Sequence, residues 1–145
     1  DEVKKAIGET LEEILKGLDE YEFKRIADSV LSLSAFGNRY FQSQAPWKTL
    51  ETDKKACAET IYNCLWIARA LVVFMSPLLP RKAQELWEQL AEDSHLEDVS
   101  ITEILNPPTV GKALKAPKPL FESISDKKIA ELTERVKERI SKARG

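Results

Sequence analysis

The chain has 145 residues, the size of one ordinary domain, and this length is enough to bury an apolar core. Its formal net charge is −2, with 22 Lys and Arg against 24 Asp and Glu, which argues against a general polyanion binder such as a non-specific DNA-binding protein. One histidine and two cysteines are too few for a zinc site, and no apolar run reaches transmembrane length, so we expect no metal, no membrane contact and a cytosolic location.

Helical periodicity dominates the N-terminal third. Apolar residues recur at three- and four-residue steps over residues 3–18, which predicts a first amphipathic helix. A second helix is predicted over residues 19–40, where Gly37 would allow close approach of a neighbouring helix. The predicted buried stripes are Val3, Ile7, Leu11, Ile14 and Leu18 in the first helix, and Phe23, Ile26, Ala27, Val30, Leu33 and Gly37 in the second.

The periodicity breaks at residues 42–50. Pro46 is expected to stop the second helix and to bias Ala45 towards an extended conformation. Thr52 or Asp53 then serves as the N-cap of a third helix that runs to about Met75. This helix is apolar over much of its circumference, so we expect it at the centre of a bundle. The apolar residues that predict its central position are Ile61, Cys64, Leu65, Ala68, Leu71, Val72 and Met75.

The C-terminal half alternates helix, loop and helix. Pro80 is well placed at the first position of a fourth helix. Residues 91–122 are irregular and proline-rich, and Leu120 and Phe121 are expected to pin this long loop to the core. Ser125 is expected to cap a last helix that reaches residue 143. Its apolar stripe is Ile129, Leu132, Val136 and Ile140.

These elements predict an all-α fold, a bundle of about five helices in a single domain over residues 1–145, with a long proline-rich loop before the last helix. Cys57 and Cys64 lie two helical turns apart, about 10 Å, which is too far for a disulfide, so we expect two reduced core thiols. The chain begins with Asp1 rather than Met, and we therefore expect a fragment of a larger protein.

Two segments carry more information than periodicity. Residues 38–48 read Asn-Arg-Tyr-Phe-Gln-Ser-Gln-Ala-Pro-Trp-Lys, which closely resembles the methionyl-tRNA synthetase signature of Asn-Arg-Tyr followed by Gln-Ala-Pro-Trp. Residues 75–80 read Met-Ser-Pro-Leu-Leu-Pro and precede Glu-Leu-Trp at 85–87, a pattern similar to one found in several class I synthetases. The resemblance implies that the chain is the helical anticodon-binding domain of such an enzyme, without its catalytic half.

The resemblance also implies a binding mode. Trp47 would stack on an unpaired base of the anticodon loop of a methionine-accepting tRNA, a contact worth about 1–3 kcal/mol, and Pro46 would hold the corner that points the ring outwards. Asn38 and Arg39 can read base edges or phosphates, but we favour structural roles for both. Asn38 would tie down the third helix, and Arg39 would pair with a carboxylate. Lys48 is either a phosphate contact or a solvated lysine.

Catalytic residues are not expected in this chain. The class I catalytic core needs a motif with two histidines and a Lys-Met-Ser-Lys-Ser-like loop over ATP, whereas His95 is alone and no Gly-rich loop opens a helix. We therefore expect no cofactor here, while the parent enzyme would use ATP to join methionine to its tRNA, and its catalytic domain would be a partner of this one. Two alternatives stay open: a helical protein-interaction module without RNA binding, and the anticodon domain of another class I synthetase.

Overall fold

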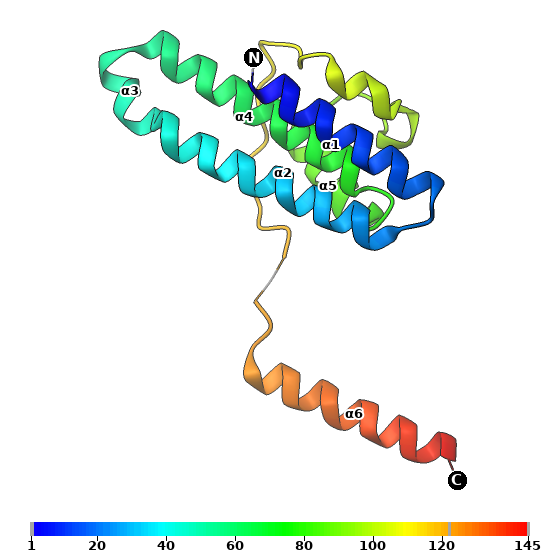
Figure 1. Cartoon of the computed structure of the whole chain (residues 1–145). Helices are drawn as coiled ribbons and strands as arrows, with labels where there is room; N and C mark the ends of the chain where they lie inside the picture. Colours follow the sequence, from blue (N-terminus) through cyan, green and yellow to red (C-terminus); the bar gives the residue numbers. More distant parts are fainter. Residues whose placement is uncertain (1, 122, 145) are drawn as a thin grey trace.

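The structure is a computed structural model that describes residues 2–121 and 123–144. These residues form helices and turns without any strand, so the all-α prediction is confirmed (Figure 1). In chain order the elements are α1 (Glu2–Asp19), α2 (Phe23–Gln44), α3 (Pro46–Thr52), α4 (Lys54–Met75), α5 (Pro80–Gln89), the 3-10 turns η1 (Leu96–Asp98) and η2 (Ile101–Leu105), and α6 (Asp126–Arg144).

Helices α1 and α2 form an antiparallel pair that is joined by a tight turn. Tyr21 adopts a left-handed conformation with φ 56°, which ends α1 at Asp19 and delays α2 to Phe23. The prediction that Asp19 opens the second helix is therefore wrong. Leu18 and Phe23, both predicted to be buried, flank this turn and are exposed. The other predicted residues of the first stripe are buried, namely Val3, Ile7, Leu11 and Ile14.

Two glycines bring the helices close together. A Cβ atom at Gly17 would lie 2.7 Å from Cγ1 of Ile26, and one at Gly37 would lie 3.0 Å from Cγ2 of Ile67. The second distance confirms that Gly37 permits close approach of a neighbouring helix, which is α4. Helix α2 therefore packs on α1 near one end and on α4 nearer the other.

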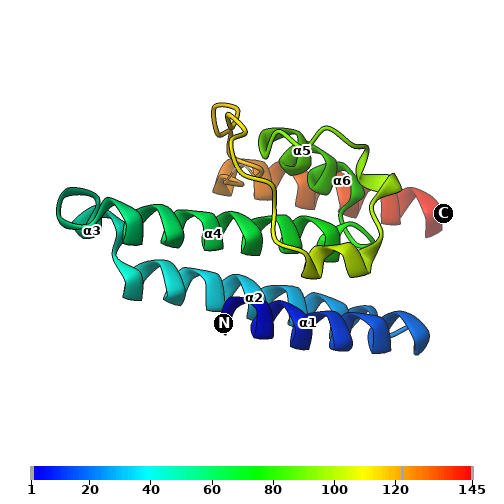
Figure 2. The same ribbon diagram turned by 90° about the horizontal axis from the view of Figure 1, so that it is seen from above.

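Helix α4 is the centre of the bundle, as predicted, and contacts α1, α2, α3 and α5 (Figure 2). Its buried side differs from the predicted one, because Ile61 is exposed and Leu65 and Leu71 are only half-buried. By length and composition α4 could cross a bilayer, but its packing on several sides identifies it as a core helix. Its buried residues are Cys57, Thr60, Trp66, Ile67, Ala70, Val72, Val73 and Phe74.

The connection after α5 is less irregular than the sequence predicts. Helix α5 begins at Pro80 as expected, and the two 3-10 turns that follow bury Leu96 and Ile104. The indole Nε1 of Trp66 donates a hydrogen bond to the carbonyl oxygen of Ile104 over 2.8 Å. The indole of Trp87, which is also buried, donates to another main-chain carbonyl of this connection.

Residues 106–118, which we call the strap, run back over α4 and α5 without helical structure. Their anchors are polar: Tyr62 donates its hydroxyl hydrogen bond to the carbonyl of Pro108, and Lys112 forms ion pairs with Glu92 and Asp93. Phe121 is 62% exposed, so its predicted role as an apolar anchor is wrong, whereas Leu120 is half-buried. Glu92, only 15% exposed at its side chain, also pairs with Arg69 of α4.

Helix α6 stands away from the bundle (Figure 1). Ser125 caps it as predicted, since its Oγ accepts a hydrogen bond from the backbone N–H of Lys128. The predicted stripe at residues 129, 132, 136 and 140 is exposed, and every described side chain of this helix lies at the surface. The bundle therefore consists of the five helices α1 to α5. The predicted five included the last helix, which is outside the bundle, and lacked the short α3.

Candidate functional site

The junction between α2 and α3 is a single residue. Ala45 has φ 43° and ψ 59°, and it caps the C-terminus of α2 and the N-terminus of α3 at the same time. Its N–H donates to the carbonyl of Phe41 over 3.1 Å, and its own carbonyl accepts from the N–H of Lys48 over 2.8 Å. The predictions of an extended Ala45 and of an irregular segment at 42–50 are therefore wrong, because a left-handed residue turns the chain directly from one helix into the next.

Pro46 and Trp47 occupy the first turn of α3. Pro46 is buried at the position where a helix does not need a backbone N–H. Trp47 follows it and is 49% exposed, whereas Trp66 and Trp87 are 3% and 1% exposed in the core. The ring of Trp47 rests on Phe41, with 5.5 Å between the centroids and 56° between the planes. One part of a large aromatic ring is thus fixed and the other part is free to stack on a planar ligand.

Asn38 and Arg39 lie on α2, one to two turns before this junction, and both are exposed. Within the described residues Arg39 forms no ion pair and Asn38 no side-chain hydrogen bond, although Asn38 lines a small hollow together with Ile67 of α4. Tyr40, the third residue of the motif, is the structural one. It is 9% exposed, and its hydroxyl accepts a hydrogen bond from Nδ2 of Asn63 over 2.8 Å. The signal that could have revealed Asn63 is a lone amide within an otherwise apolar stretch of α4.

We call residues 38–55, around the α2–α3 junction and the start of α4, the tip of the bundle. Lys48, Lys54 and Lys55 are exposed there. Over the parts of the chain that the structure describes, none of the three forms an ion pair. Asp53 rather than Thr52 is the N-cap, since one of its carboxylate oxygens accepts from the N–H groups of Lys55 and Ala56 over 3.1 and 3.0 Å. The tip therefore carries exposed cations, while its backbone donors at residues 55 and 56 are already used.

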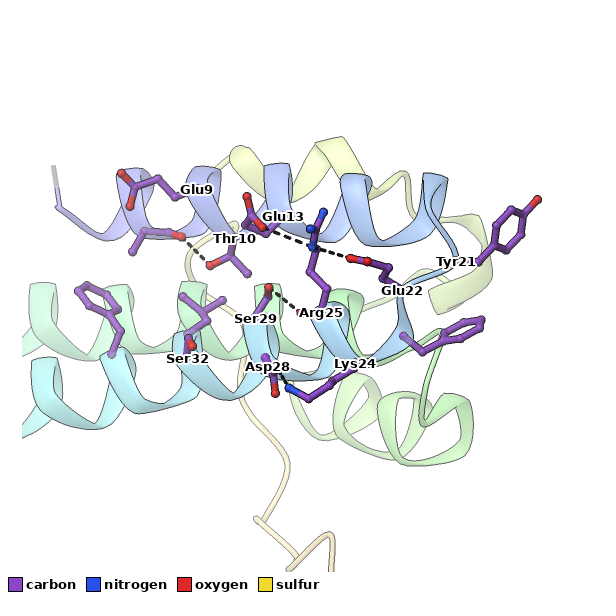
Figure 3. A pocket seen from close by; sticks show the side chains of 14 residues that line it. Glu9, Thr10, Glu13, Tyr21, Glu22, Lys24, Arg25, Asp28, Ser29 and Ser32 are labelled. Atoms are coloured by element: carbon purple, nitrogen blue, oxygen red, sulfur yellow. Dashed lines mark hydrogen bonds and ion pairs between the residues drawn. The ribbon is translucent and has the colours of Figure 1, made fainter.

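The opposite end of α1 and α2 has a different character (Figure 3). A hollow of about 900 Å³ lies between these helices, and Arg25 is held there by Glu13, Glu20 and Glu22 at 4.0, 2.7 and 2.9 Å. A hydrogen bond from Lys16, together with its charge, lowers the pKa of Glu13. Residues 13–28 contain five carboxylates and three basic side chains, so this end is acidic.

Within the described residues, the side chains that could bind a metal ion do not gather at one place. His95 is exposed, and no cluster of three or more His, Cys, Asp or Glu side chains suited to a metal ion occurs in the described part of the chain. Cys57 is buried and Cys64 half-buried, and both are free thiols, as predicted. Burial raises the pKa of the Cys64 thiol, which disfavours the reactive thiolate. The most distinctive surface is therefore the tip around Trp47.

Comparison with known proteins decides the family. A family model described as the anticodon binding domain of methionyl tRNA ligase matches residues 1–140. The chain belongs to this family. Similar proteins named methionine–tRNA ligase come from Methanosarcina acetivorans, 39% identical over 98% of this chain, and from Methanospirillum hungatei, 40% identical over 97%. A third, from Methanothrix thermoacetophila, is 38% identical over 99% of this chain.

The anticodon-binding domain spans about a fifth of the length of these relatives, between 20% and 21% in each. The match to methionine–tRNA ligases also sets aside the alternative of another class I synthetase. Because the family match extends across the whole bundle and most of α6, it does not indicate which residues contact RNA. The assignment of individual residues of this methionyl-tRNA ligase domain to RNA contact therefore depends on their geometry.

Proposed function

We propose that this domain binds the anticodon loop of a methionine-accepting tRNA and that Trp47 stacks on an unpaired base of that loop. The observation that carries the proposal is the 49% exposed indole, which is held between the Pro46 corner and the ring of Phe41. Single-stranded RNA exposes flat base surfaces, and a base stacked on an aromatic side chain contributes about 1–3 kcal/mol. Asn38 and Arg39 share this tip and supply donors for base edges or phosphates.

The domain would act as the recognition part of a larger enzyme. In this proposal the full-length ligase joins methionine to its tRNA with ATP, and the chemistry takes place in a catalytic domain elsewhere in the parent chain. The present domain then contributes neither a catalytic residue nor a cofactor site, and the complete enzyme works in the cytosol. Its role is to favour tRNAs with the right anticodon by the free energy of the contacts at the tip.

The test replaces Trp47 in the full-length ligase and measures binding of an RNA hairpin that carries the methionine anticodon. Trp47→Ala is expected to lower the affinity by about 5- to 150-fold, which corresponds to the loss of one stacked base. Trp47→Phe keeps an aromatic face and should retain most of the affinity. ATP-dependent activation of methionine should not change, because this domain takes no part in that step.

Two results would contradict the proposal. One is unchanged hairpin affinity in the Trp47→Ala enzyme. The other is a loss of cooperative unfolding in the same variant, which would make Trp47 a structural residue that the bundle cannot do without. Thermal unfolding followed by circular dichroism measures the second possibility directly.

A second candidate function is a helical protein-interaction module, and helix α6 is the observation that favours it. Its stripe of branched aliphatic side chains is exposed, with Ile129 at 51% and Val136 at 55%. Within a ligase we propose that this stripe packs against the catalytic domain of the same chain. Hairpin binding that depends on Trp47 but not on the double change Ile129→Ser and Val136→Ser would separate RNA recognition from this docking role.

A further inference from the structure

We infer that four basic residues at the tip, including Lys54 and Lys55 of α4, form a phosphate-binding rim that holds the RNA backbone while Trp47 takes a base. This inference rests on the proposed function and extends it to the sugar-phosphate chain. The rim consists of Arg39, Lys48, Lys54 and Lys55, which are all exposed.

The rim differs from the α1–α2 turn region, residues 13–28, in whether its basic side chains are paired with carboxylates. Among the described residues none of the four basic groups forms an ion pair with a carboxylate. At the far end of the same helices the basic groups are paired: Lys16 with Glu13, Lys24 with Asp28, and Arg25 with three glutamates. Cations that are left without a carboxylate partner are available to an anionic ligand.

Local charge supports the same interpretation although the whole chain is acidic. Residues 39–55 contain four basic side chains against two carboxylates, Glu51 and Asp53, which gives a net charge of +2. The segment at 13–28 has a net charge of −2. Along α2 the nearest charges of the two segments, Asp28 and Arg39, lie eleven residues or about 16 Å apart, about twice the Debye length of about 8 Å at physiological salt. An approaching phosphate chain is therefore attracted by the tip and repelled by the other end.

The cap of α4 determines which groups can bind a phosphate. The carboxylate of Asp53 already accepts from the N–H groups of Lys55 and Ala56, so these donors are not available to RNA. Binding must use the side chains, and lysine ammonium groups act as point charges without the planar fork of arginine. Contacts of this kind position a nucleic acid but do not read its sequence. The contribution of Lys54 and Lys55 should thus be the same for every anticodon.

The test uses the full-length ligase with two RNA hairpins, one with the methionine anticodon and one with a scrambled loop. The double variant Lys54→Gln and Lys55→Gln should bind both hairpins more weakly by the same factor. Its plot of log affinity against log salt concentration should be less steep by about 1.4, or about 0.7 for each single-strand phosphate that is no longer neutralised. The control variant, Lys24→Gln and Lys82→Gln, has the same change in net charge away from the rim and should keep the original slope.

The possible outcomes separate the rim from the proposed function. If the unmodified ligase prefers the methionine hairpin but the Lys54 and Lys55 variant keeps its full salt dependence, the rim is wrong and the proposed function stands. An equal change of slope in the control variant would also overturn the rim, because it would reflect total charge. If the unmodified ligase binds neither hairpin better than the other, the proposed anticodon recognition itself fails. A variant that weakens only the methionine hairpin would show base reading rather than phosphate binding.

Discussion

Replacement of Ala45 by glycine should stabilise the domain, although glycine destabilises most helical positions. Ala45 has φ 43°, in the left-handed region, where a residue with a Cβ atom is about 1–2 kcal/mol less favourable than glycine. Glycine offsets about 0.5–1 kcal/mol of this gain, because it loses more conformational entropy than alanine when the chain folds. The net gain in the free energy of unfolding is therefore about 0.5–1 kcal/mol, which for a domain of this size raises Tm by about 2–4 °C.

The matched control lies in the same helix. Ala35 is an exposed residue in the interior of α2, and Ala35→Gly should lower the free energy of unfolding by about 1 kcal/mol. The two variants thus make the same chemical change with opposite expected signs. Urea and thermal unfolding, followed by circular dichroism, measure both. If Ala45→Gly destabilises the domain as much as Ala35→Gly, the left-handed junction between α2 and α3 is incorrect.

Two further predictions concern packing inside the bundle. Gly17→Ala should lower the free energy of unfolding in urea by roughly 1–3 kcal/mol, because its Cβ would lie 2.7 Å from Ile26. Gly37→Ala should lower it less, because its nearest contact is 3.0 Å. Equal stability of the Gly17 variant and the parent chain would contradict this packing. Cys64 should react slowly with a bulky thiol reagent at neutral pH and faster as the pH rises, since burial raises its pKa and only the thiolate reacts. If Cys64 in the folded domain is labelled as fast as in urea, the thiol is not shielded.

The features that the sequence predicts best are those with a local cause. Asp53, Pro80 and Ser125 each mark the start of a helix through a side chain or ring that acts within one turn. Pro80 and Ser125 are found where expected, and Asp53 is one of the two caps that the sequence offered for α4. The Ala45-Pro46 junction does not follow from the sequence because the usual preference of a residue before proline is extended, while here two flanking helices hold Ala45 in the left-handed region.

The buried face of α4 could not be predicted because the helix is apolar nearly all round, so periodicity does not favour one side. Which side is buried is decided by partners distant in sequence, such as Ile104, whose carbonyl binds Trp66. The candidate site divides in the same way. The motif indicates Trp47 and Arg39. The basic residues at 54 and 55 could not be assigned to the same site from the sequence, because they join it only when α3 packs beside the start of α4.

The single-residue junction at Ala45 has a consequence for the kinetics of binding. Since α2 ends where α3 begins, the tip contains no flexible loop, and its backbone is fixed by hydrogen bonds on both flanks. Each side chain that becomes immobilised on binding costs about 0.5–1.5 kcal/mol. At the tip this cost arises from a few lysine side chains and not from the main chain, which is already ordered. An RNA loop that docks on this rigid ledge would bear most of the conformational change itself. Its rate of capture would then be limited by how often its own bases unstack, and a pre-opened loop should associate faster than a stacked one.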